Sequence, residues 1–346
     1  MHGRAPVSAT LAAIVLLIGA CDSRPLAMGD VNAIIMTASP DLWAHVGDEL
    51  LDRIEASDVF TVRDEHAFRV MYQDPNDEPW VRVRLLKQQL VVGTASDPWV
   101  AQVLEEVGAD EGAQVGTADN PGVVQVEDVW SRGQLVTALV LPEDAGAVAA
   151  AEMVRQSIPG LRELFDAQYR EWVTARMFVT GRDSARARML AEEHGFSMML
   201  PEVYEYEANE SVHIFINDNP DPSELIRQFA VTWRSTTAEE ITAEALLEWR
   251  SRVVESYDFP QVVNTDHLIE GREVVGGRRV HSVQAIWQNP PGTYPAAGPF
   301  ITWAVECPQQ QRTYLVDAWL YAPEKDKYEY MIQLGVIMDS FRCGGD

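Results

Sequence analysis

Basic residues are scarce in this chain. Its 346 residues include 27 Lys and Arg against 53 Asp and Glu, for a formal net charge of −26 and a pI near 4.5. Such a surface repels the phosphates of nucleic acids and the head groups of anionic lipids, which argues against both as partners. The remaining composition, 47% hydrophobic and 23% charged, is typical of a folded globular protein, and the length favours two domains.

Long apolar runs are also missing. Spanning a bilayer takes about 20 apolar residues, and the apolar run Leu11–Leu17 is much shorter. It follows a basic start and leads into Ile18, Gly19, Ala20 and Cys21. A charged head, a short apolar segment and small residues before a cysteine are typical of a bacterial lipoprotein signal peptide. A conventional secretory signal, cut elsewhere, is the competing interpretation.

The lipoprotein interpretation predicts a location. Residues 1–20 form the signal peptide, residues 21–30 form a lipidated tether, and Cys21 carries acyl chains that insert into the bilayer. Each buried methylene adds about 0.8 kcal/mol of membrane affinity, so two or three chains anchor a protein durably. We therefore predict a lipid-anchored envelope protein with its body outside the cytoplasm. Asp22 follows the lipidated cysteine, and because the retention of such lipoproteins in the inner membrane is not universal, the sequence leaves open whether the membrane is inner or outer.

Cysteines are few. With Cys21 used for the lipid, Cys307 and Cys343 remain, and an even pair in an oxidising compartment favours a disulfide. Two separate buried thiols are the alternative. Neither cysteine has a CxxC partner or a nearby histidine, so the sequence does not support a zinc site.

Recognisable catalytic motifs are absent. The chain contains no GxSxG, no GxxxxGKS and no HExxH, and its histidines are never paired at ligand spacing. We predict no catalytic residue, no cofactor and no metal, and the chain is more consistent with a non-enzyme. Asp266 and His267, with His281, are the one candidate for a hydrolase, although adjacent residues point apart on a strand. The oxygen-rich stretch 217–221 resembles a calcium loop but favours a turn.

The apolar periodicity predicts an α+β fold with two related halves, residues 31–193 and 194–346. Each is expected to be a mostly antiparallel sheet packed with helices, because runs of adjacent strands favour that architecture. Ser39 and Pro40 predict a helix start. Residues 81–85 alternate like a strand, and Pro159-Gly160 is expected to interrupt the helical middle.

Several segments resemble the bacterial lipoproteins of domain-of-unknown-function family 4837 (DUF4837). They are residues 28–34, 41–50, 286–288, 298–303 and 318–323, in this order along the chain. The proline-rich loop 290–295 departs from that pattern. The resemblance implies a lipoprotein of this fold and no known activity. The second half also weakly resembles PsbP-like or Mog1-like domains, which implies an α/β/α sandwich around an antiparallel sheet.

Four aromatic residues near the Gly298-Pro299 step suggest a ligand pocket for a sugar or peptide: Trp287, Tyr294, Phe300 and Trp303. Ordinary sheet core is the competing interpretation. Taken together, the sequence predicts a non-enzymatic binding or assembly factor of the envelope with a protein partner there. A periplasmic hydrolase and a solute-binding lipoprotein remain the alternatives.

Overall fold

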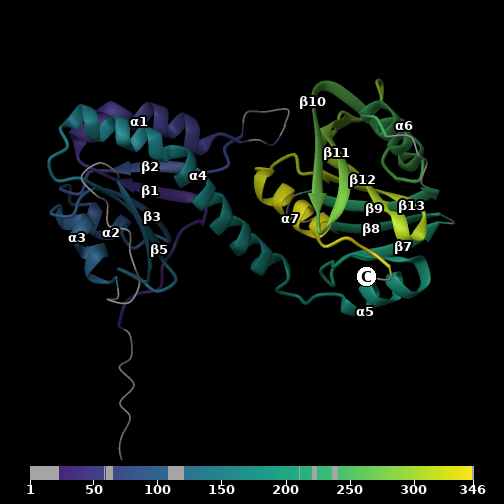
Figure 1. Ribbon diagram of the computed structural model, residues 1–346, viewed down its shortest axis with the longest axis horizontal. Coiled ribbons are helices and arrows are strands. Elements are labelled where there is room, and N and C mark those ends of the chain that lie inside the picture. Colours follow the sequence, from purple (N-terminus) through teal and green to yellow (C-terminus); the bar gives the residue numbers. More distant parts are fainter. Residues whose placement is uncertain are drawn as a thin grey trace, which may run out of the picture.

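The computed structural model describes residues 23–57, 59, 65–107, 121–209, 211–219, 224–235 and 241–344. The predicted signal peptide and Cys21 lie outside these residues. Figure 1 shows two sheet-containing halves, with the chain entering the first half from below and ending in the second. The α+β class is thereby confirmed.

The first half is built on a five-stranded sheet in the order β2-β1-β3-β5-β4. Pairs β1–β2, β1–β3 and β3–β5 are parallel, and only β4–β5 is antiparallel. The elements are β1 (Ala33–Thr37), α1 (Pro40–Glu55), β2 (Arg69–Gln73), α2 (Trp80–Val83), β3 (Gln88–Thr94), α3 (Pro98–Glu105), β4 (Gly122–Glu127) and β5 (Leu135–Leu141).

This sheet corrects the prediction of a mostly antiparallel first half, and with it the prediction of two related halves. Helices separate β1, β2 and β3 along the chain. A helical connection brings the chain back to the same end of the sheet, so the next strand runs parallel to the previous one. Residues 81–85 are also corrected, since α2 occupies most of them. Trp80 and Val83, three residues apart, both pack on the sheet, as a helical turn requires.

Helices cover both faces of the first sheet. Helix α1 begins at the predicted cap, where Ser39 Oγ accepts a hydrogen bond from the Leu42 amide at 3.3 Å. It packs beside α4 (Ala147–Met177) on one face, while α2 and α3 cover the other. On that second face, Trp99 Nε1 donates to the Val92 carbonyl at 3.0 Å.

Helix α4 runs without a break through Pro159, contrary to the prediction. A proline inside a helix costs about 3 kcal/mol. The apolar face of α4 offsets this cost, because Ile158, Leu161 and Phe165 around the proline are all buried in the first core. The helix then continues toward the second half (Figure 1).

The second half is built on a seven-stranded, fully antiparallel sheet in the order β10-β11-β12-β13-β9-β8-β7. The strands are β7 (Glu205–Asn209), β8 (Val212–Asn219), β9 (Leu225–Ser235), β10 (Val262–Val275), β11 (Arg278–Gln288), β12 (Ala297–Cys307) and β13 (Arg312–Tyr321). Helix α6 (Ala243–Val254) covers one face and α7 (Tyr328–Asp339) the other. The α/β/α sandwich expected of the second half is therefore present.

A buried ion pair fastens α6 to this sheet. Arg250 Nε lies 2.8 Å from Asp317 Oδ1, and the two side chains are 1% and 0% exposed. The Tyr257 hydroxyl donates to Asp317 Oδ2 at 2.7 Å, and burial with the neighbouring carboxylate raises the pKa of Tyr257 well above 10. Gln261 accepts from Arg250 at 2.6 Å. The stability of this contact therefore depends on both charges, because each buried charge has the other as its counter-charge.

Helix α7 belongs to both cores. Leu334, Ile337 and Met338 pack under the second sheet, whereas Ile332 is buried in the core of the first half. The two halves therefore share their last helix, and Figure 1 shows α7 on the side of the second half that faces the first.

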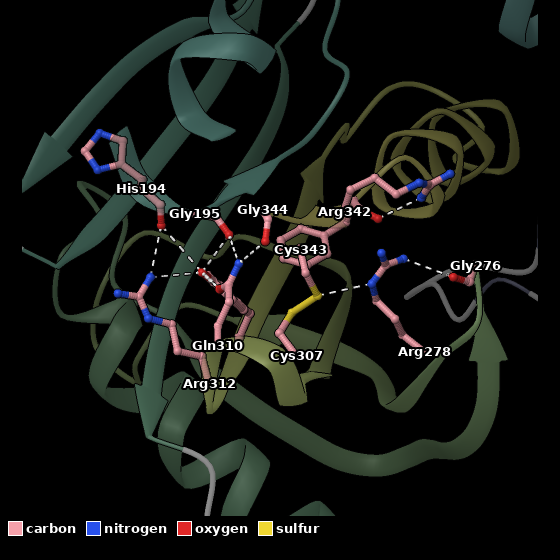
Figure 2. Close-up of a disulfide and its surroundings, with 12 residues drawn as sticks. His194, Gly195, Gly276, Arg278, Cys307, Gln310, Arg312, Arg342, Cys343 and Gly344 are labelled. Carbon is pink, nitrogen blue, oxygen red and sulfur yellow. Dashed lines mark hydrogen bonds between the residues drawn. A yellow bond between two sulfur atoms is a disulfide. The ribbon is translucent and has the colours of Figure 1, made fainter. Parts of the chain in front are cut away.

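The C-terminal strand is fixed to the second half. Strand β14 (Arg342–Cys343) pairs with β6 (Phe196–Ser197), which follows α5 (Ser184–Met189) and the π-helical turn η1 (Leu190–His194). Cys343 is bonded to Cys307 at the end of β12, with the two Cα atoms 5.9 Å apart. Figure 2 shows this disulfide beside Arg278, whose Nε lies 3.1 Å from Cys343 Sγ.

Candidate functional site

A cavity of about 270 Å³ opens at one end of the second sheet, on the face that α6 covers. We call it the aromatic pocket. Its lining comes from the ends of β8, β9, β11 and β13, from the residue Phe259 beyond α6, and from the loop after β11. The lining residues are Asp218, Glu224, Ile226, Phe259, Trp287, Asn289, Tyr294, Ala296, Trp319 and Tyr321.

Aromatic rings form the floor of the pocket. Trp287 and Trp319 meet edge to face with ring centroids 5.2 Å apart, and Phe259 meets Trp319 in the same way at 5.8 Å. Trp287 Nε1 donates to the Leu320 carbonyl at 3.0 Å, which fixes that indole. These contacts fix both indoles beneath the opening, where Trp287 is 2% and Trp319 0% exposed.

Gly298 makes this floor possible. It lies opposite Trp287 in the β11–β12 ladder, and a Cβ there would meet the Leu320 carbonyl oxygen at 2.0 Å. A larger residue would force strand and indole apart. The Gly298-Pro299 step, first noted in the sequence, therefore has a packing reason.

The loop 290–295 forms one wall. Asn289 Nδ2 donates to the Tyr294 carbonyl at 2.7 Å, and the Asn289 amide donates to the Ala296 carbonyl at 2.9 Å. Gly292 takes a φ of 87°, which suits glycine at this turn. The Tyr294 side chain is 73% exposed at the mouth. The segment that departs from the DUF4837 pattern thus carries a ring of the pocket.

The charged groups that line the pocket are all acidic. Asp218 and Glu224 contribute two carboxylates, and none of the described lining residues is basic. Burial, followed by the hydrogen bond and charge of Glu224, raises the pKa of Tyr321 to about 12. Tyr321 donates a hydrogen bond to Glu224, whose carboxylate lies at the pocket wall.

One donor in the floor lacks a partner. Trp319 is fully buried, yet its Nε1 has no acceptor among the described residues. A buried N–H without an acceptor costs about 1 to 3 kcal/mol.

Aromatic rings, two carboxylates and no base among the described lining residues together suit an organic cation, because a cation is attracted both to ring faces and to carboxylates.

The four aromatic residues proposed from the sequence separate into two groups. Trp287 and Tyr294 lie in the aromatic pocket, whereas Phe300 and Trp303 do not. Phe300 is fully buried under α6 with the Arg250 guanidinium 3.8 Å from its ring centroid. Trp303 packs in the core on the opposite face, because residues an odd number apart on a strand point to opposite sides.

Other lining residues were not apparent from the sequence. Trp319 and Tyr321 alternate on β13, a period-two signal that places them on one face, but nothing in their spacing pairs them with Glu224. Asp218 belongs to the oxygen-rich stretch 217–221. Its residues 217–219 continue β8 instead of forming the predicted turn, and 220–223 lie outside the described residues.

The hydrolase candidates do not form a catalytic group. Asp266 and His267 are exposed on the edge strand β10. His281 is buried on β11, opposite Arg272, and its Nε2 lies 2.8 Å from Glu270 Oε1. Within the described part of the chain, no three His, Cys, Asp or Glu side chains are arranged to hold a metal ion.

A second histidine site lies near the disulfide. His213 and His194 have ring centroids 4.3 Å apart, and the Tyr206 hydroxyl lies 3.0 Å from His213 Nδ1. Burial, followed by the charge of His194, lowers the pKa of His213 to about 4.

Gln310 joins two backbone segments by hydrogen bonds. Its Nε2 donates to the carbonyls of Gly195 and Gly344 at 2.7 Å each (Figure 2). These groups hold the chain end in place.

Residues 183–340 match the family described as Domain of unknown function (DUF4837). The resemblance to this family is confirmed over that range, which contains the aromatic pocket. The resembling segments before residue 183 lie outside the match. No curated protein sequence matches the chain.

Three solved structures resemble part of the chain. A mutant of protein Mog1 is 10% identical, covering 43% of this chain and 91% of that one with a TM-score of 0.31. The Saccharomyces cerevisiae Ran-binding protein Mog1p is 11% identical, covering 43% and 90% with a TM-score of 0.30. LpqN of Mycobacterium tuberculosis, involved in cell envelope biogenesis, is 11% identical, covering 43% and 83% with a TM-score of 0.28.

Among the described residues, no helix combines the length and apolarity needed to cross a bilayer.

Proposed function

We propose that this chain is a lipid-anchored protein of the bacterial cell envelope that binds an organic cation, free or carried by an envelope partner, in its aromatic pocket. The observation that carries the proposal is the pocket itself, with five aromatic side chains, two carboxylates and no base among its described lining. A cation of the size of a trimethylammonium group fits this chemistry. The role is binding and assembly, not catalysis.

Two features support the location. The Cys21 motif is typical of lipoproteins, and a disulfide such as Cys307–Cys343 persists in an oxidising compartment. The binding role is favoured over a hydrolase because Asp266 and His267 are exposed while His281 is buried and paired with Glu270. A general base needs those groups within reach of one substrate.

The test begins with cells that express the wild-type protein or Cys21→Ser. The wild type is expected in the membrane fraction and Cys21→Ser in the soluble fraction. The full-length wild-type protein, in detergent, is then titrated by calorimetry with choline and with its neutral isostere 3,3-dimethylbutan-1-ol. Choline is expected to bind about ten-fold or more tightly than the isostere, because only the cation gains from the carboxylates and ring faces.

Glu224→Gln removes one pocket charge and is expected to weaken choline binding about ten-fold while leaving the isostere unchanged. Glu207→Gln, an exposed carboxylate on the edge strand β7, is the matched control and is expected to change neither. Equal affinity for choline and the isostere would rule out a cation site. A wild-type protein found in the soluble fraction would rule out the anchor.

A further inference from the structure

A second cavity, of about 420 Å³, lies where the two halves meet. We call it the junction pocket. Its walls are the amino ends of β1, β2 and β3, the last turns of α4, and the start of α7. It is distinct from the aromatic pocket in residues and in charge.

The junction pocket gathers basic side chains in an acidic protein. Its lining includes Arg69, Lys87, Arg176 and Lys325 with His66, against the carboxylates of Asp30, Asp326 and Glu329. The formal balance is four positive minus three negative, or +1 with histidine neutral, in a chain of net charge −26. Such a site attracts an anion that the rest of the surface repels.

The distribution of the lysines distinguishes this pocket from the rest of the chain. The whole sequence contains three lysines, Lys87, Lys325 and Lys327. Two of them line the junction pocket, and the third is buried beside it, where its Nζ lies 2.5 Å from Glu65 Oε1. Arginine serves as the basic residue in the rest of the chain, so the ammonium groups are confined to this one place.

Two of the three carboxylates in the pocket, Asp326 and Glu329, are engaged with arginines. Asp326 pairs with Arg69 at 2.7 Å, and Glu329 lies 3.7 Å from Arg176. Neither Lys87 nor Lys325 pairs with a carboxylate in the described part of the chain. Two ammonium groups are thus left to face an incoming anion.

An aromatic ring holds two of the pocket cations, Lys87 and Arg176, in position. Trp172, Tyr169 and Tyr328 form a stack across the junction, with successive centroids 6.0 Å apart and planes within 11°. The Lys87 Nζ lies 6.0 Å from the Trp172 ring centroid, and the Arg176 guanidinium lies 5.0 Å from it. Two rings come from α4 and one from α7, so the stack also ties the halves together.

The pocket also lies close to the start of the body. Residues 29–32 form part of its wall, eight residues or more after Cys21. The Met28 carbonyl accepts from the Lys87 amide at 3.0 Å, and the Ala27 amide donates to the Arg132 carbonyl at 2.9 Å. Eight residues span at most about 29 Å, so a lipid anchor at Cys21 would keep the junction pocket near the head groups.

We propose that the junction pocket binds a phosphate group, carried either by a membrane lipid or by a small free ester. Lysine ammonium groups act as point charges that suit phosphate, and the flanking arginines add fixed donors. The lipid source, unlike the site, rests on the anchor proposed above.

The three lysines allow a direct test. The full-length protein in detergent is treated with an amine-acetylating reagent, with and without glycerol 3-phosphate, and each lysine is quantified by mass spectrometry. Lys87 and Lys325 are expected to be protected several-fold by the phosphate ester, while the buried Lys327 serves as an internal control. Glycerate, a carboxylate of similar size, is expected to protect less.

A second arm identifies the source. Full-length protein in vesicles of phosphatidylglycerol is compared with protein in micelles of a neutral glycoside detergent. Protection in vesicles alone assigns the site to lipid head groups, and protection by glycerol 3-phosphate in micelles assigns it to a free ester. Protection in neither arm overturns the proposal.

Affinity provides an independent readout. The double variant Lys87→Gln, Lys325→Gln is expected to lower affinity for glycerol 3-phosphate about ten-fold or more. Arg252→Gln, which removes an exposed charge on α6, is the matched control and is expected to leave it unchanged. A double variant that matches the control, with a normal urea midpoint, overturns the proposal. Choline binding in the aromatic pocket is unaffected by these changes, so the two proposals fail separately.

Discussion

Replacing Asp317 by asparagine is expected to destabilise the second half by about 3 to 5 kcal/mol. The change leaves the Arg250 guanidinium buried without a counter-charge, and Arg250 is only 1% exposed, so water cannot replace the lost carboxylate. Gln261 and the ring of Phe300 contact the guanidinium before and after the change and do not alter the difference.

The assay is a urea titration followed by near-UV circular dichroism, because the α6 face of the sheet contains Trp249, Trp287 and Trp319. With a slope of about 2.5 kcal/mol per molar urea for a half of this size, the midpoint is expected to fall by about 1 to 2 M. Glu248→Gln is the control, since its partner Arg252 and Glu248 are 55% and 71% exposed, and we expect a change within about 0.5 kcal/mol.

A double variant tests the reason for the loss. Arg250→Met combined with Asp317→Asn removes the stranded charge, so it is expected to be more stable than Asp317→Asn alone. A midpoint for Asp317→Asn no lower than the control, or a double variant less stable than the single one, would refute the reasoning.

Two further predictions concern the region near the chain end. Between its unfolded pKa near 6.5 and its folded pKa of about 4, His213 takes up a proton more readily in the unfolded chain, so stability is full above pH 6.5 and falls as the pH drops toward 4. The loss is expected to reach about 1 to 3 kcal/mol, and His213→Gln should remove most of it when urea midpoints at pH 7 and pH 4.5 are compared. Reducing the Cys307–Cys343 bond, which closes a separation of 36 residues, is expected to cost about 3 to 4 kcal/mol, measured as the urea midpoint with and without reductant. An unchanged midpoint in either comparison contradicts the corresponding prediction.

Local signals in the sequence predicted much of the second half. Strands β12 and β13 of that half are almost continuously buried, as short apolar runs between turn residues indicate, and in the first half the cap at Ser39 marked the start of α1 as observed. These features depend on neighbours within a few residues, which is the range that sequence patterns report.

Long-range pairing accounts for most of what the sequence did not predict. Strands β1 and β3 are almost continuously buried, and a short apolar run of this kind fits a buried strand of either direction, so the direction of pairing between β1, β2 and β3 was not visible. Residues 81–85 alternate in hydrophobicity but also fit one helical turn, which short segments cannot distinguish. The prediction of a break at Pro159 was wrong. The helix continues because the burial of apolar side chains along α4 outweighs the loss of a single hydrogen bond.

The candidate sites were harder to predict for the same reason. Trp287 and Tyr294 were found because they are close along the chain. Glu224 and Tyr321 meet only when β9 and β13 pair. The junction pocket combines residues near positions 30, 87, 172 and 325, and no local pattern joins such distant segments.

The shared helix α7 has a consequence for how the protein is made. Synthesis from the amino end delivers the first half long before residues 328–339 are made, yet Ile332 completes the core of that half. The apolar face that Ile332 covers stays exposed until almost the whole chain has emerged. A chain cut short before α7 would leave apolar surface of both cores exposed to proteases. Only a chain that includes α7 closes both cores.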